Sequence, residues 1–199
     1  MKVLILWSGG VESTSLLKQY LSETQHEIFA HYIRMTNPEG RLQSENQAVI
    51  ELFPLLSKIR SFHLSFSSIS ICNGQALPND IKVLMMIGSA AFYYHKCDEM
   101  YVGWSFEDHD IRTTVNGVHT VIKRDDTWWA EFQALLQPQL KPEHSAAKVL
   151  PYHPSGDWPK KQHMEYLGDL LKHTHSCRRP INGVDCGKCH SCLERNGHE

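Results

Sequence analysis

Residues 8–14, Ser-Gly-Gly-Val-Glu-Ser-Thr, lie between an apolar run and a segment with helical periodicity. A Gly-Gly turn at this position exposes backbone N–H groups at a helix N-terminus, where unpaired donors and the helix dipole favour an anion. The alternative is a turn in which the glycines only reverse the chain and Ser13 only caps the helix. The density of donors favours an anion site, and the residues expected to form it are Ser8, Gly9, Gly10, Val11, Glu12, Ser13 and Thr14.

The turn lacks the Gly-Lys-Ser/Thr ending of a Walker A loop and the G-x-G-x-x-G pattern of a dinucleotide fold. It resembles the pyrophosphate loop of the N-type ATP pyrophosphatases, Ser-Gly-Gly-x-Asp-Ser after a first strand. The resemblance implies that the turn binds ATP and Mg²⁺, and that pyrophosphate leaves while a substrate is adenylated. Glu12 stands where that family has Asp. One extra methylene moves the carboxylate by roughly 1.5 Å, which a water-mediated Mg²⁺ contact absorbs, so we expect Glu12 to serve the metal or the geometry of attack.

Four cysteines near the other end of the sequence have the spacing C-x8-C-G-x-C-x-x-C. Four thiolates on short loops close a tetrahedral Zn²⁺ site, and a site with four protein ligands is structural. The alternatives are two disulfides, a redox pair or an iron–sulfur cluster, and zinc is favoured in a chain with no recognisable secretory signal. Neighbouring cations, Arg195 among them, are expected to offset the charge and to donate to the sulfurs. The predicted ligands are Cys177, Cys186, Cys189 and Cys192.

The glycine turn and the cysteine spacing together resemble the 7-cyano-7-deazaguanine synthase (QueC) family. The tail of that family reads Ser/Thr-Cys, eight residues, then Cys-Gly-x-Cys-x-x-Cys-x-x-Arg, and residues 176–195 match it throughout. The resemblance implies an adenine nucleotide α-hydrolase-like sheet, Mg·ATP, a structural zinc and 7-carboxy-7-deazaguanine as substrate. Between the two ends, Arg41 and Glu45 align with the family's motif after its second strand, where Leu42 replaces the His, and only Glu131 and Phe132 resemble its substrate-side loop.

The chemistry that the resemblance implies is adenylation of a carboxylate followed by amine attack, which gives an amide; in the parent family a second adenylation dehydrates that amide to a nitrile. A second interpretation within the same resemblance is an enzyme of bacterial antiviral gene clusters that attaches the deazaguanine to an amine of a partner protein. A third, from another class, is a non-catalytic, zinc-stabilised adaptor. The family also tends to form homodimers.

Other polar residues are weaker candidates. Asp108 and Asp110 precede a predicted hairpin, and Asp125 and Asp126 follow it, at the sheet edge where open α/β folds bind ligands. They are candidates for positioning an amine or Mg²⁺, although solvated turn acids are more common there. Either Trp128 or Trp129, but not both, is expected to stack on a purine-like ring. At the start of the last predicted helix, Lys160 and Lys161 are candidates for contacting ATP phosphates, or else form a solvated helix end.

Strand-like runs alternate with helical segments, so a parallel sheet covered on both faces must position these residues. The predicted strands are "KVLILW", "EIFAHYI", "SFHLSF", "EMYVGW" and "KVLPY", and the predicted helices cover 12–21, 44–58, 79–95 and 159–173. Pro54 makes the second helix doubtful beyond Phe53, and Asp157 is the expected N-cap of the last helix. Asn116-Gly117 predicts a two-stranded flap at about 110–124. We expect one ATP pyrophosphatase domain over 1–173 and a cysteine-rich segment over 174–199 packed on it.

The composition limits the classes of molecule that the protein is expected to bind. With 199 residues, 41% apolar content and a formal charge of -2, the chain can bury one good core and lacks the basic excess typical of nucleic-acid binders. Nucleic acid is therefore an unexpected partner, and a small molecule or a protein is favoured. No segment has the length of a membrane span or of a signal-peptide core, so the expected location is the cytoplasm.

Overall fold

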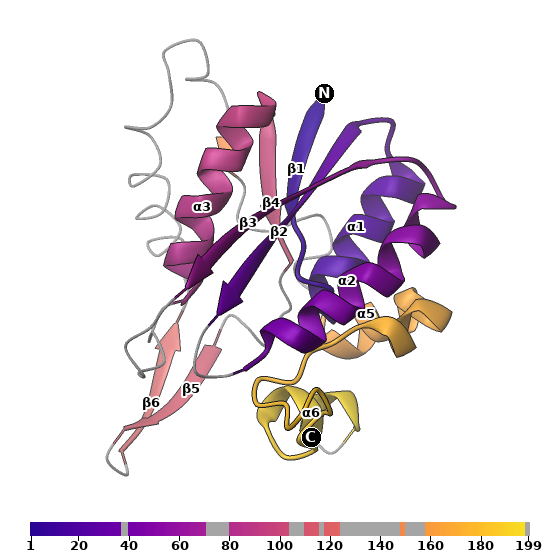
Figure 1. The fold of residues 1–199 in the computed structure, drawn as a ribbon. Coiled ribbons are helices and arrows are strands. Elements are labelled where there is room, and N and C mark those ends of the chain that lie inside the picture. Colours follow the sequence, from indigo (N-terminus) through magenta and orange to yellow (C-terminus); the bar gives the residue numbers. More distant parts are fainter. Residues whose placement is uncertain are drawn as a thin grey trace.

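A five-stranded, fully parallel sheet forms the centre of the molecule (Figure 1). The computed structural model describes residues 1–36, 40–70, 80–103, 110–115, 118–123, 148–149 and 158–197. The strand order is β3-β2-β1-β4-β7, so the chain moves outward from β1 on one side and then crosses to its other side. Ligands of open α/β sheets bind at such a reversal, beyond the carboxyl ends of the strands. The strands are β1 (Lys2–Leu6), β2 (Glu27–Thr36), β3 (His63–Ser70), β4 (Glu99–Val102) and β7 (Lys148–Val149).

Helices cover both faces of the sheet, as the sequence predicts (Figure 1). On one face lie α1 (Val11–Glu23), α2 (Leu42–Ser57), α5 (Lys160–Leu167) and the 3-10 helix η4 (Gly168–His173), and on the other lies α3 (Asp80–His95). The short helix α6 (His190–Arg195) belongs to the cysteine-rich segment, which lies beyond the carboxyl ends of the central strands. The α/β class and the Rossmann-like architecture predicted from the sequence are confirmed.

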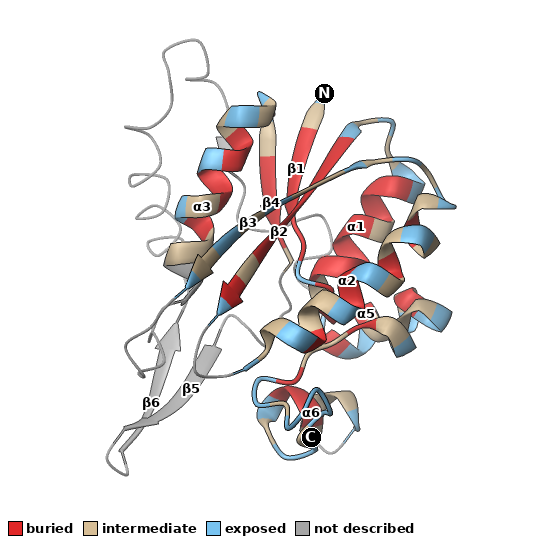
Figure 2. Cartoon of the chain, viewed as in Figure 1, coloured by how far each residue is buried: buried red, intermediate tan, exposed pale blue. Residues whose placement is uncertain are grey.

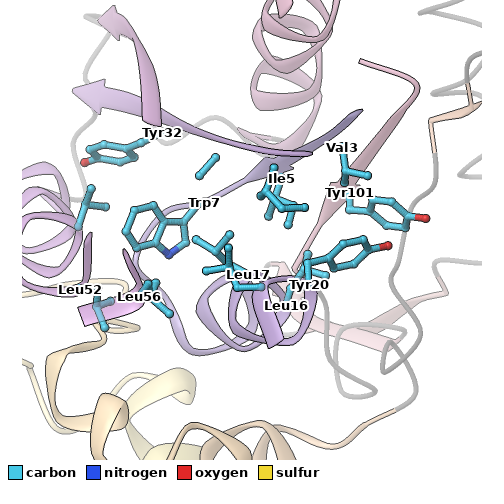
Figure 3. Packing of buried hydrophobic residues seen from close by; sticks show 14 of the residues in the cluster. Val3, Ile5, Trp7, Leu16, Leu17, Tyr20, Tyr32, Leu52, Leu56 and Tyr101 are labelled. Atoms are coloured by element: carbon cyan, nitrogen blue, oxygen red, sulfur yellow. The ribbon is translucent and has the colours of Figure 1, made fainter. Parts of the chain in front are cut away.

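The apolar pattern of the strands explains why the sheet is buried on both sides (Figure 2). In β1, Val3 and Ile5 face α1 and α2, whereas Leu4 and Leu6 face α3. Trp7 continues the first row, and Figure 3 shows it packed among leucines of α1 and α2. A strand with apolar residues on both faces requires cover on both, which is the pattern of a parallel sheet.

The second predicted helix extends to its expected end despite the doubt raised by Pro54, whereas the last predicted helix differs in its length and its N-cap. Pro54 lies inside α2, which continues to Ser57. Leu52 and Leu56 are fully buried, and this packing offsets the backbone hydrogen bond that a proline removes. The last helix is α-helical only to Leu167 and then becomes η4, and its N-cap is Pro159 and not Asp157.

The predicted flap is present as an antiparallel hairpin of β5 (Asp110–Val115) and β6 (Val118–Lys123), which forms a sheet of its own. Its Asn116-Gly117 turn lies outside the described residues. Among the helices that the structure describes, none combines the length and the apolarity that a bilayer crossing requires.

Candidate nucleotide site and metal centre

The glycine turn has the predicted position between β1 and α1. Gly9 has a φ of 75°, a conformation that favours glycine, and Gly10 caps α1 without a side-chain hydrogen bond. The Ser8 and Ser13 hydroxyls lie 3.3 Å apart, and the Ser8 N–H donates to Ser13 Oγ over 3.3 Å. The first turn of α1 therefore presents its N-terminus and two hydroxyls at the carboxyl edge of the sheet, where an anion is stabilised.

Two of the predicted turn residues contribute backbone only. Val11 and Thr14 are completely buried, and the Thr14 hydroxyl accepts a hydrogen bond of 3.1 Å from the indole N–H of Trp7. The Val11 N–H donates to Ser176 Oγ over 3.4 Å. The hydroxyl that faces this end of α1 besides Ser8 and Ser13 thus comes from Ser176, at the other end of the chain.

Two close backbone approaches hold the turn from either side. A Cβ atom added to Gly9 would lie 2.8 Å from the Cβ of Ala48 in α2. A Cβ atom added to Gly103, directly after β4, would lie 2.4 Å from the backbone nitrogen of Ser13. Both glycines are needed because no other residue permits these approaches.

Lys160 lies beside the turn, where its ammonium group contacts two carboxylates. Its Nζ lies 3.2 Å from Glu12 Oε1 and 2.8 Å from Glu194 Oε2. Burial alone would raise the pKa of Glu12, but the Lys160 ammonium lowers it overall. Burial would likewise lower the pKa of Lys160, and the two carboxylates raise it. Glu12 and Lys160 therefore form a charged pair at neutral pH, whereas the neighbouring Lys161 is exposed.

The residues before the first cysteine of the cluster also contact the turn. The His175 N–H donates to the Gly9 carbonyl over 2.9 Å. The Arg195 guanidinium, expected to donate to sulfur, instead donates to the carbonyls of Leu171 and Thr174, each over 2.8 Å. These bonds fix the path of the chain from η4 past the turn and into the cysteine cluster.

The four predicted metal ligands converge on one point. Their sulfur atoms all lie within 4.8 Å of one another, and the Cys186–Cys192 and Cys189–Cys177 separations are 4.0 and 3.9 Å. Four sulfurs at the usual zinc–sulfur bond length would lie about 3.8 Å apart in a tetrahedron. In an iron–sulfur cube each sulfur binds a different corner and the four spread further. The donor set therefore fits one tetrahedral ion.

Backbone N–H groups support these sulfurs, as is usual around metal-bound thiolates. The Cys186 N–H donates to Cys177 Sγ over 3.2 Å, and the Cys189 N–H donates to Cys186 Sγ over 3.3 Å. Cys97 is separate from the cluster, and burial raises the pKa of its thiol to about 12, which makes it a core residue and not a nucleophile.

Arg41 and Glu45, the aligned substrate candidates, lie at the start of α2 as an ion pair of 3.7 Å. Their side chains are 18% and 13% exposed, which is low for charged residues. Beside them the Tyr32 hydroxyl is buried with no hydrogen-bond partner among the described residues. Asp108, Trp128, Asp125, Asp126 and Trp129 lie outside the described residues, and Asp110 is described only as the first residue of β5.

The comparisons with known proteins support the architecture. No protein-family model matches the chain, and no curated protein does. Among solved structures, the chain is similar to the U34-tRNA thiolase NcsA from Methanococcus maripaludis with its [4Fe-4S] cluster, with a TM-score of 0.54 and 15% sequence identity. The alignment covers 98% of this chain and 66% of that protein, so the chain spans less than two thirds of its length. The likeness shows the fold.

Three residues of the site were not singled out by the sequence. Gly103 is needed only because β4 ends against α1, and a glycine directly after a predicted strand was the available signal. Glu194 sits between the cysteine ligands and Arg195 and has no local signature. Tyr32 lies in the apolar run of β2 and its sequence position is that of an ordinary core residue. Only its buried hydroxyl, without a partner among the described residues, sets it apart from the other core residues.

Proposed function

We propose that the protein is an ATP-dependent adenylating enzyme that activates a carboxylate for attack by an amine. The observation that carries this proposal is the glycine turn: a helix N-terminus at the sheet reversal with Ser8, Ser13 and a buried Lys160 beside it. This combination offers backbone donors, hydroxyls and a cation to a triphosphate, and lacks the sequence of the Walker A and dinucleotide sites.

Formation of the amide consists of two substitutions, and a nitrile product requires a second adenylation, on the amide oxygen, which then leaves with AMP. A carboxylate oxygen of the substrate attacks the α-phosphorus of ATP, the bond to the β-phosphate oxygen breaks, and pyrophosphate leaves. An amine then attacks the activated carbonyl carbon and loses a proton, and AMP leaves with the oxygen. The backbone donors of the turn and Lys160 stabilise the charge that develops on pyrophosphate. Mg²⁺, held through Glu12, would neutralise the phosphate oxygens when bound.

The substrate we propose is 7-carboxy-7-deazaguanine, on the basis of the cysteine tail that resembles the 7-cyano-7-deazaguanine synthases. Arg41 and Glu45 support a ring with hydrogen-bond donors and acceptors, since a carboxylate accepts from ring N–H groups and a guanidinium donates to a carboxylate. For the cysteine cluster we propose one structural Zn²⁺, because the sulfur separations suit a single ion.

The test is pyrophosphate exchange into ATP with purified protein, Mg²⁺ and 7-carboxy-7-deazaguanine, followed by mass spectrometry after ammonium is added. We expect exchange that requires the deazaguanine acid, loss of exchange in Ser13→Ala, and an amide or nitrile product. If the acyl group appears only on a partner polypeptide, the amine is that of a protein. The solved neighbour is a tRNA thiolase, so an arm with tRNA is included. Absence of exchange with every substrate would leave the adaptor interpretation.

A further inference from the structure

Lys160 joins three elements through a single ammonium group. It is the first residue of α5. Glu12 lies in the first turn of α1, and Glu194 lies in α6, two residues after the last of the four cysteines. The three side chains are 7%, 19% and 11% exposed, so the group is largely withdrawn from water. A charge cluster this buried is costly to form and is characteristic of sites where charge is used.

The two contacts of Lys160 differ in length and in surroundings. The contact with Glu194 is the shorter, 2.8 Å against 3.2 Å for Glu12. The second oxygen of Glu194 is fixed as well, because it lies 2.9 Å from Nε2 of His190 one turn earlier in α6. Glu12, in contrast, belongs to the turn that would receive the nucleotide. Glu194 is therefore the fixed partner and Glu12 the one that a ligand can replace.

We propose that Glu194 is a positioning residue for nucleotide binding: it holds the Lys160 ammonium at the edge of the glycine turn, ready to exchange Glu12 for a phosphate oxygen. The inference rests on the proposed ATP site. A triphosphate in the turn brings several negative charges towards Lys160, and the exchange leaves the Glu12 carboxylate to Mg²⁺. Because Glu194 stays in place, the ammonium does not have to be ordered again when the nucleotide arrives.

The proposal gives the cysteine-rich segment a role at the site beyond stability. Cys192 lies one helical position before Leu193 and two before Glu194, so the metal centre fixes the start of the helix that carries Glu194. The donor set fits a single ion, and with that ion bound α6 would present Glu194 to Lys160. Nucleotide affinity should therefore depend on this segment. Among the described residues, its cysteines contact one another and do not hydrogen-bond to the glycine turn.

The experiment is titration calorimetry of Mg²⁺ and α,β-methylene-ATP, which cannot be cleaved at the reacting bond. We expect Glu194→Gln to keep its metal content and its melting temperature while its Kd for the analogue rises about tenfold. The matched control is Glu51→Gln, because Glu51 Oε2 pairs with His173 Nδ1 at 2.8 Å and likewise joins two elements, α2 and η4, through a carboxylate. Its Kd should be unchanged.

A double-mutant cycle separates positioning from general damage. If Glu194 acts through Lys160, Lys160→Gln alone weakens binding and the added Glu194→Gln weakens it no further. Independent, multiplying effects would overturn the proposal, and so would an unchanged Kd in Glu194→Gln, or a loss of metal together with affinity in that variant. If the wild-type protein binds no Mg·ATP analogue, the proposed function fails together with this proposal. If the wild-type protein binds it and Glu194→Gln binds it equally well, only the role of Glu194 fails.

Discussion

The approach of Gly103 to the start of α1 gives the sharpest test of the site. Replacing Gly103 by Ala adds one methyl group, which would lie 2.4, 2.5 and 2.7 Å from Ser13 N, Ser13 Cα and the Glu12 carbonyl carbon. Ordinary contacts begin near 3.4 Å, and all three atoms belong to the backbone, so α1 has to move by about 1 Å. Gly103 is not among the described glycines with positive φ, so the cost arises from this contact and not from backbone strain.

The expected consequences follow from that displacement. Overpacking against backbone should cost about 2–3 kcal/mol of unfolding free energy, and a chain of this size should then melt roughly 5–10 °C lower. A 1 Å misplacement of positioning groups costs a reaction about a hundredfold, so kcat/KM for ATP in pyrophosphate exchange should fall by that factor.

The control is Gly88→Ala in α3, whose added Cβ would lie 2.9 Å from both terminal carbons of Leu6. This contact is also shorter than an ordinary one, but it involves a flexible side chain on the opposite face of the sheet, so stability should change and kcat/KM for ATP should not. Thermal melting and pyrophosphate exchange on the same preparations separate the two effects. A Gly103→Ala enzyme with wild-type kcat/KM would refute the inference that the position of the turn determines nucleotide use.

Three further predictions concern other parts of the chain. Burial, with a smaller effect of His95, lowers the pKa of His31 to about 4, so His31 is neutral in the folded protein and protonates more readily on unfolding. The free energy of unfolding should therefore reach its full value above pH 6.5 and be about 2 kcal/mol lower at pH 5. Urea unfolding at pH 7 and pH 5 checks this, and a His31→Gln variant with an undiminished pH dependence would contradict it. Tyr32→Phe removes a buried hydroxyl without a partner among the described residues, so the free protein should be as stable or up to about 1 kcal/mol more stable by thermal melting; a marked loss would mean that an ordered water satisfies the hydroxyl. Purified protein should contain one tetrahedral metal ion per chain by elemental analysis, and chelation should lower its melting temperature; acid-labile sulfide with several irons would contradict the single-ion site.

The features that the sequence predicts well are those encoded locally. Two adjacent glycines between a strand and a helix, and four cysteines within sixteen residues, limit the local chain so strongly that the turn and the convergence of the four sulfurs follow from spacing alone. The apolar run of β1 similarly requires cover on both faces.

The features that the sequence does not reveal depend on tertiary contact. Nothing near Glu194 indicates that it meets Lys160, 34 residues earlier, and Thr14 has the residue type of a phosphate ligand although its hydroxyl is bonded to Trp7 in the core. Pro54 illustrates the opposite case, in which burial of the neighbouring leucines overrides a local preference.

The hydrogen bond between the Val11 N–H and Ser176 Oγ spans 165 residues of sequence. At about 5–20 residues per second, a ribosome needs on the order of ten to thirty seconds to make the intervening chain. The glycine turn is thus synthesised well before the serine that completes its hydrogen bonds. A chain that ends before His175 and Ser176 would form much of the sheet and still lack these partners of its own glycine turn, so the turn is complete only once the tail has been made.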